Sequence, residues 1–356
     1  MKGLYNMENK KLNVDNRILY LDVLRIVASF AVMLGHASAQ NWYKSDIHSF
    51  EWQVFNFYGS MLRWSVPVFA MISGVLFLEG RRNIKKHILR IVTAFVFWSI
   101  LYALIEILHG ANIEGFWIEV VRGHYHMGFL YRIVGLYLLV PFFVKIVESR
   151  ALTKYFLLLS LIFTIILQQA SLILTIFDCS EITGLVKYIL GSIDFHFTLG
   201  LSSYFVMGYY LSKVEISKKC RLVIYILSLL AVAFTFTATS ILSLYSNKPR
   251  TLFYLGFTLN VLLESLGVFV FAKYNFGLIN FSKRARNFII KFSNYSFGAF
   301  LVHLIILEQL NEVCGINTMT FNPILSVPLL AVIVFCSSYA ISYLCHKIPV
   351  LNKYIV

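Results

Sequence analysis

The stretch that decides the fold is ILYLDVLRIVASFAVMLGHASA, residues 18–39. It is an apolar run long enough to cross a bilayer as one helix, and it contains Asp22, Arg25 and His36. Arg25 and His36 are eleven residues apart, so on a helix they return to nearly the same face, about 16 Å apart along the axis. Asp22 precedes Arg25 by three residues, near enough to pair with it. Because ionisable groups inside a membrane are costly, they predict a functional site facing the interior of a helix bundle.

The rest of the chain has the same apolar character. Of its 356 residues, 59% are hydrophobic and 13% are charged, whereas about a quarter are charged in soluble domains. Apolar stretches of about 20 residues recur throughout, and they predict an all-α polytopic membrane protein with about ten transmembrane helices. The expected spans are about 18–39, 62–79, 88–109, 127–147, 152–175, 197–213, 219–242, 251–272, 290–311 and 324–346.

The net charge of +14 is distributed unevenly between the connections of these spans. With the N-terminus placed in the cytoplasm, 23 Lys and Arg residues fall in cytoplasmic segments and 6 in outward ones. This asymmetry follows the positive-inside rule and predicts that both termini are cytoplasmic. The orientation of the chain in a lipid bilayer therefore explains the net positive charge, and we expect no nucleic-acid partner. We expect one membrane domain at 18–346, between cytoplasmic tails at 1–17 and 347–356.

The outward segment 124–126 (HYH) is a candidate for metal binding. No other residues with metal-ligand spacing accompany it, so we expect no bound metal. His126 is then better interpreted as a substrate contact beside His36. Cys179 and Cys314 also fall in outward loops, and the sequence leaves open whether they form a disulfide.

Several segments resemble, in order, those of the integral-membrane acyltransferase-3 family. Arg25, ten further residues and His36 resemble its Arg-x10-His signature. The resemblance extends over about residues 18–346, nearly the whole chain. The other matching segments are 65–74 (SVPVFAMISG), the basic stretch 85–90 (KKHILR), 126–131 (HMGFLY), 204–210 (YFVMGYY) and 294–298 (NYSFG), closing at His303.

Members of this family O-acylate cell-surface carbohydrates, and the chain looks closest to the short, stand-alone branch. The resemblance implies an O-acyltransferase of the bacterial cytoplasmic membrane. It would move an acyl group, expected to be acetyl, from cytoplasmic acetyl-CoA to a hydroxyl of an outward-facing surface or lipid-linked glycan. The identity of the acceptor, and the choice between direct transfer and a covalent intermediate, stay open.

Acyl transfer to a hydroxyl needs a base for the alcohol proton and positive charge near the developing oxyanion. His36 suits the first role, because an imidazole titrates near neutral pH. Arg25 lies too far along the helix to contact the same oxyanion. With Asp22 it is expected to hold the pantetheine arm of the donor or to organise the pore.

Binding of the acyl donor needs cations for its phosphates, which arginine binds through two parallel hydrogen bonds. The residues expected to bind acyl-CoA are Lys86, Arg90, Arg82 and Ser73. The residues expected to contact the acceptor are His126, Tyr131 and His303.

Two other functions remain open from the sequence. A small-solute transporter would share the polytopic architecture and the intramembrane charges, but it predicts inverted repeats, which the chain does not show. A sensing or substrate-delivering membrane module would keep the fold without turnover, and it would tolerate loss of His36.

Overall fold

The computed structural model describes residues 17–79, 83–110, 112–177, 181–182, 184–186, 188 and 200–356. Within those ranges the chain is helical, with turns between the helices and no strand. Arg82, Cys179 and the expected tail, apart from Arg17, lie outside the described residues.

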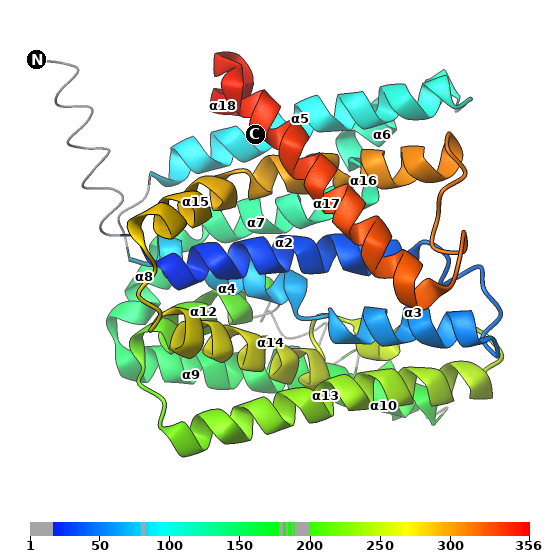
Figure 1. Ribbon diagram of the computed structural model, residues 1–356. Helices are drawn as coiled ribbons and strands as arrows, with labels where there is room; N and C mark the ends of the chain where they lie inside the picture. The colour runs from blue at the N-terminus through cyan, green and yellow to red at the C-terminus, as the bar shows by residue number, and fades with distance from the viewer. Residues whose placement is uncertain are drawn as a thin grey trace, which may run out of the picture.

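Long helices lie side by side and form the body of the protein (Figure 1). Most run in nearly the same direction, whereas α17 crosses them obliquely (Figure 1). The long segments are α2 (Leu19–Ala39), α5 (Ile84–Leu108), α9 (Arg150–Ser160) followed by α10 (Leu167–Ile176), α13 (Lys218–Tyr245), α14 (Leu259–Phe271) and α17 (Pro323–Lys347). The shorter helices are α3 (Phe50–Met61), α4 (Ser65–Phe77), α6 (Phe116–Arg122), α7 (Gly128–Leu138), α8 (Val140–Glu148), α12 (Leu201–Lys213), α15 (Lys283–Asn294), α16 (Ser296–Glu312) and α18 (Pro349–Tyr354).

The membrane-spanning character predicted from the sequence is confirmed. In the described ranges, 7 helical segments are long and apolar enough to cross a membrane, or up to 9 if each of two bent pairs is one span. One bent pair includes α7 and α8, where Pro141 enters the first turn of α8 and cannot donate to the preceding helix. The other pair is α15 and α16, bent by 55°. The protein is thus a polytopic membrane protein.

Two expected spans differ in extent from the structure. The span expected at 62–79 begins earlier, since α3 and α4 together form one segment, Phe50–Leu78. Its first half was missed because polar residues interrupt it, although Trp52 and Phe55 are fully buried in the bundle. The span expected at 197–213 corresponds to α12, which has 13 residues and is too short to count by itself.

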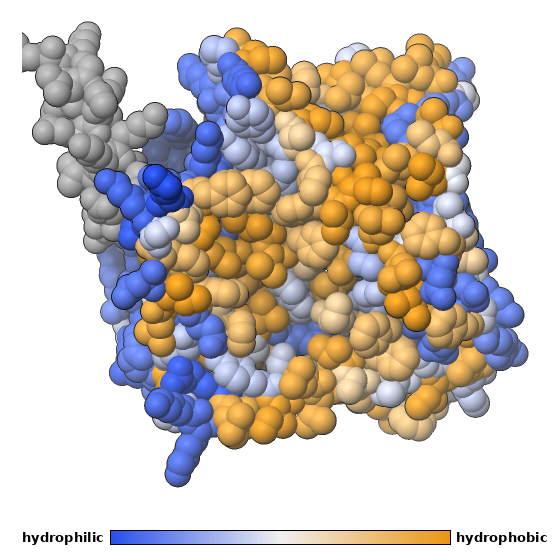
Figure 2. Space-filling view, viewed as in Figure 1, coloured by the Kyte–Doolittle hydropathy of each residue, from blue (hydrophilic) through white to orange (hydrophobic). Residues whose placement is uncertain are grey.

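The surface supports this placement in a bilayer. Figure 2 shows hydrophobic residues across the middle of the molecule and hydrophilic residues along two opposite edges. Large apolar side chains of α13 are exposed, among them Leu222, Leu229 and Ile241. Exposed apolar residues in such a band are stable against lipid tails.

Two glycines let α4 and α12 cross in close contact. A Cβ atom on Gly74 of α4 would lie 1.8 Å from the Phe205 carbonyl oxygen. A Cβ atom on Gly208 of α12 would lie 2.3 Å from the Met71 carbonyl oxygen. Small residues allow this backbone approach in membrane bundles. The two segments 65–74 and 204–210, which carried part of the family resemblance, therefore meet in space.

The position of α2 explains why its polar residues matter. Figure 1 shows α2 in the middle of the bundle, and it packs against α3, α4, α15, α16 and α17. A polar group on this helix meets other helices rather than lipid. The polar face of α2 is therefore suited to line an internal site.

The orientation in the membrane can be tested with reporter fusions. We expect reporters after Lys44, Glu114 or Asn247 to read outside, and reporters after Lys219 to read inside. The reason is that the basic residues concentrate on the side of Lys219, which the positive-inside rule makes cytoplasmic. In the structure, the ends of α2 and α13 lie at one edge of the bundle, and the start of α13 lies at the opposite edge (Figure 1). Lys44 and Asn247 therefore belong to one side, and Lys219 to the other. A cytoplasmic signal after Asn247 would contradict this topology. Below, "outer" refers to the edge where α2 ends.

Candidate functional site

Asp22 has a different partner from the one expected. Its carboxylate accepts hydrogen bonds from Arg17 Nε at 2.9 Å and Arg17 Nη2 at 2.8 Å, and from Ser293 Oγ at 2.7 Å. No ion pair with Arg25 forms among the described residues. Arg17 is the partner because it lies just before the helix and can donate from two nitrogens of its guanidinium to the two carboxylate oxygens. Asp22 thus joins the start of α2 to α15.

Among the described residues, Arg25 has no partner for its charge. Its guanidinium makes no hydrogen bond or ion pair with any described residue, although Asp22, Tyr137 and Tyr339 lie near enough to act on it electrostatically. Arg90 lies within the same electrostatic range. Unpaired cations inside a protein are costly. The arrangement therefore offers unused hydrogen-bond donors in the inner half of the bundle.

The residues expected to bind the donor are only partly brought together. Arg90 lies near Arg25, and its Nη2 donates to the carbonyl of Val356. Lys86 is exposed at the start of α5, away from this interior. Ser73 is half-buried on α4.

Four histidines meet near the outer end of α2: His36, His124, His126 and His303, here called the histidine cluster. The ring centroid of His303 is 5.1 Å from that of His36 and 5.1 Å from that of His126. The Nδ1 atoms of His124 and His126 are 3.1 Å apart. His36 comes from α2, His303 from α16, and the other two from the turn before α7. Of the residues predicted to face a common substrate, His36, His126 and His303 do lie together.

Hydrogen bonding leaves several ring nitrogens of this cluster unused. His303 Nδ1 donates to the Phe300 carbonyl at 2.5 Å, and because a carbonyl only accepts, Nδ1 carries the proton. Nε2 of His303 and Nε2 of His126 are buried and have no hydrogen-bond partner in the part of the chain that the structure describes. His36 is half-buried, touches the rings of His303 and Tyr125, and makes no hydrogen bond with a described residue. Its imidazole is available to a substrate.

Two further residues support the cluster and were not among the predicted site residues. Tyr102 stacks on the ring of His124 with centroids 4.3 Å apart. Glu308 places Oε1 3.3 Å from His124 Nε2. Both line a cavity of about 140 Å³ between α5 and α16. The only sequence signal was the HYH segment itself, since the partners come from distant helices.

Tyr131 lies apart from these histidines. Its ring packs against that of Phe95, with centroids 4.7 Å apart, and its hydroxyl donates to the Val121 carbonyl.

The described residues contain no group of three or more His, Cys, Asp or Glu side chains arranged to hold a metal ion.

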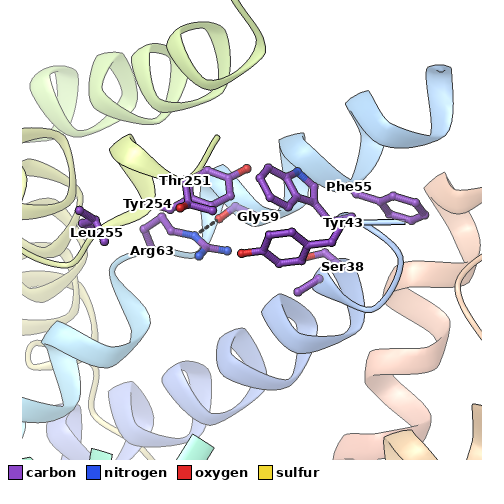
Figure 3. Close-up of a pocket in the computed structure, with 10 residues that line it drawn as sticks. Ser38, Tyr43, Phe55, Gly59, Arg63, Thr251, Tyr254 and Leu255 are labelled. Atoms are coloured by element: carbon purple, nitrogen blue, oxygen red, sulfur yellow. Dashed lines mark hydrogen bonds between the residues drawn. The ribbon is translucent and has the colours of Figure 1, made fainter. Parts of the chain in front are cut away.

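A second cavity, of about 240 Å³, lies at the same outer end and is shown in Figure 3. We call it the outer aromatic pocket. Arg63, in the break between α3 and α4, contributes its only cation, and it acts electrostatically on His36. The sequence pattern assigned Arg63 no role. The pocket is lined by Ser38, Ala39, Trp42, Tyr43, Phe55, Gly59, Arg63, Thr251, Tyr254 and Leu255.

The bundle is that of a multi-pass membrane protein, and it holds clustered imidazoles near its outer end. A family profile described as an acyltransferase domain, Acyl_transf_3, matches residues 18–346. The chain belongs to this acyltransferase-3 family, which confirms the resemblance of its motifs. Membership implies an acyl donor as substrate. No curated protein and no solved structure is significantly similar to the chain.

Proposed function

We propose that the protein is an O-acetyltransferase of the bacterial cytoplasmic membrane. It takes an acetyl group from cytoplasmic acetyl-CoA and transfers it to a hydroxyl of an outward-facing surface or lipid-linked glycan. The observation that carries this proposal is the arrangement of α2. One helix holds an unpartnered guanidinium, Arg25, in its inner half and an available imidazole, His36, near its outer end. When the acyl donor and the acceptor come from opposite sides of a membrane, the enzyme needs one group that binds the donor and another that acts on the acceptor hydroxyl. Arg25 suits the first role and His36 the second.

The chemistry follows from the available imidazole. In direct transfer, His36 accepts the hydroxyl proton as the oxygen attacks the thioester carbonyl. The carbon–sulfur bond breaks, the new ester forms, and the proton passes from His36 to the thiolate of CoA. His303, held by the Phe300 carbonyl, keeps its unprotonated Nε2 in the cluster and supports the orientation of His36.

Arg25 and Arg90 are the proposed contacts for the phosphates or pantetheine arm of the donor. We expect Arg25→Gln to weaken acyl-CoA binding by about 10- to 100-fold, since a hydrogen bond to a charged group contributes about 1.5–3 kcal/mol. Calorimetry on detergent-solubilised protein would measure it. Lys219→Gln, an exposed cation at the same edge, is the matched control and should bind like wild type. Equal affinity of Arg25→Gln and wild type would place the donor elsewhere.

The activity itself can be tested in inside-out membrane vesicles. We expect label from radioactive acetyl-CoA, added outside the vesicles, to appear on lumenal glycans as a base-labile ester. Vesicles without the protein are the control. Bound acetyl-CoA without any protein-dependent ester would contradict the proposal and favour a sensing or delivery role.

A transporter is less well supported. The two bent helix pairs are a feature that transporters share. Membership of an acyltransferase family over nearly the whole chain favours the enzyme.

A further inference from the structure

The outer aromatic pocket is centred on a cation, Arg63, that no described carboxylate pairs with. Arg63 Nε donates to the Gly59 carbonyl at 2.5 Å. Its two Nη atoms make no hydrogen bond with a described residue, and no described Asp or Glu lies within ion-pair distance. Glu264 acts on Arg63 only at longer range, and its Oε1 is already bonded to Thr235 Oγ1 at 2.8 Å.

The surroundings hold this guanidinium in place. Its central carbon lies 4.0 Å from the ring centroid of Tyr254, a cation–π contact. Figure 3 shows the guanidinium between Tyr254 and the hydroxyl end of Tyr43, facing into the pocket. A fixed fork with two free nitrogens is the geometry that binds phosphate or carboxylate through paired hydrogen bonds.

Trp42 supplies a second, independent sign of a ligand. It lines the same pocket, is only 3% exposed, and its Nε1 has no hydrogen-bond partner among the described residues. A buried donor without a partner costs about 1–3 kcal/mol. Its ring also packs 5.6 Å from that of Tyr254, so the pocket has flat aromatic walls beside its polar groups. Aromatic walls with a few placed donors are typical of small-molecule sites.

We propose that this pocket binds an anionic group, phosphate or carboxylate, carried by the sugar acceptor. The word acceptor rests on the proposed function, whereas the anion site does not. The pocket is lined by Ser38 and Ala39, within one turn of His36, and Arg63 acts electrostatically on that histidine. An anion on Arg63 therefore positions a hydroxyl of the same molecule beside the base. The protein selects anionic sugars over neutral ones.

The test compares sugars that differ in one charged group, using full-length protein in detergent. Methyl glucuronide and glucose 6-phosphate are the anionic probes, and methyl glucoside is the neutral one. Binding is followed by quenching of tryptophan fluorescence, with Trp42→Phe identifying the contribution of this pocket. We expect at least one anionic probe to bind about tenfold or more tightly than the neutral sugar. Whichever probe is preferred identifies the anion as carboxylate or phosphate.

Variants decide whether Arg63 is responsible. We expect Arg63→Gln to lose the preference, Arg63→Lys to keep part of it, and Arg122→Gln, an exposed arginine in a surface ion pair, to keep all of it. Unchanged acyl-CoA binding by Arg63→Gln shows that this variant is folded. A preference that persists in Arg63→Gln, or equal binding of neutral and anionic sugars, overturns the inference. Because the readout is binding, it stands or falls separately from acetyl transfer.

Discussion

His36→Ala is expected to abolish acetyl transfer while leaving acyl-CoA binding near wild type. Removal of a general base costs about 10²–10⁴ in rate. The donor contacts proposed at Arg25 lie about 16 Å from His36 along the same helix, so binding of acyl-CoA does not depend on the imidazole. The rate is measured as base-labile label on vesicle glycans, and the affinity by calorimetry on the same preparation.

His48→Ala is the matched control for this experiment. His48 also lies beyond the outer end of α2, but it is exposed in the turn before α3 and is not part of the histidine cluster. It should retain transfer. A folded His36→Ala protein that acetylates at the wild-type rate would show that the imidazole is not the base, and would favour the sensing or delivery module.

Gly74→Ala is expected to cause the largest loss of folded protein. The added Cβ would lie 1.8 Å from the Phe205 carbonyl oxygen and 2.7 Å from its carbon, so α4 and α12 must move apart. Overpacking of a core costs about 1–3 kcal/mol, and more where the obstacle is backbone. Gly208→Ala should act in the same direction, since its Cβ meets the backbone of Met71 at 2.3 Å. Thermal unfolding and size-exclusion chromatography in detergent would measure both.

Gly135→Ala on α7 separates this packing effect from the general replacement of glycine in a helix. A Cβ atom there meets nothing within 4 Å, and alanine is the better helix former. This variant should be as stable as wild type or more stable. Equal stability of Gly74→Ala and Gly135→Ala would contradict the close crossing of α4 and α12.

Much of the candidate site was visible in the sequence as separate parts. His36, His126 and His303 were all predicted to face the substrate, and they lie in one cluster. The ion pair of Asp22 with Arg25 was wrong, because helical spacing shows which residues can meet and not which competitor is nearer. Arg17 lies before the first expected span, so helical spacing within that span could not identify it as a partner of Asp22.

The outer aromatic pocket could not be predicted at all. Trp42, Arg63 and Tyr254 are far apart along the chain, and each by itself is typical of a membrane interface. Only the packing of α3 against α13 and of the 251–255 turn beside it makes them one site.

The sequence by itself determined that this chain is a polytopic membrane protein of the acyltransferase-3 family, with an arginine and a histidine on one face of its first span. Those properties are local, because hydropathy and helical period are set by residues that are close along the chain. The tertiary structure alone decided that His124 joins the histidine cluster, that Arg17 holds Asp22, and that no described carboxylate pairs with Arg63. Those contacts join distant segments, so they depend on how the helices pack, which no local pattern records.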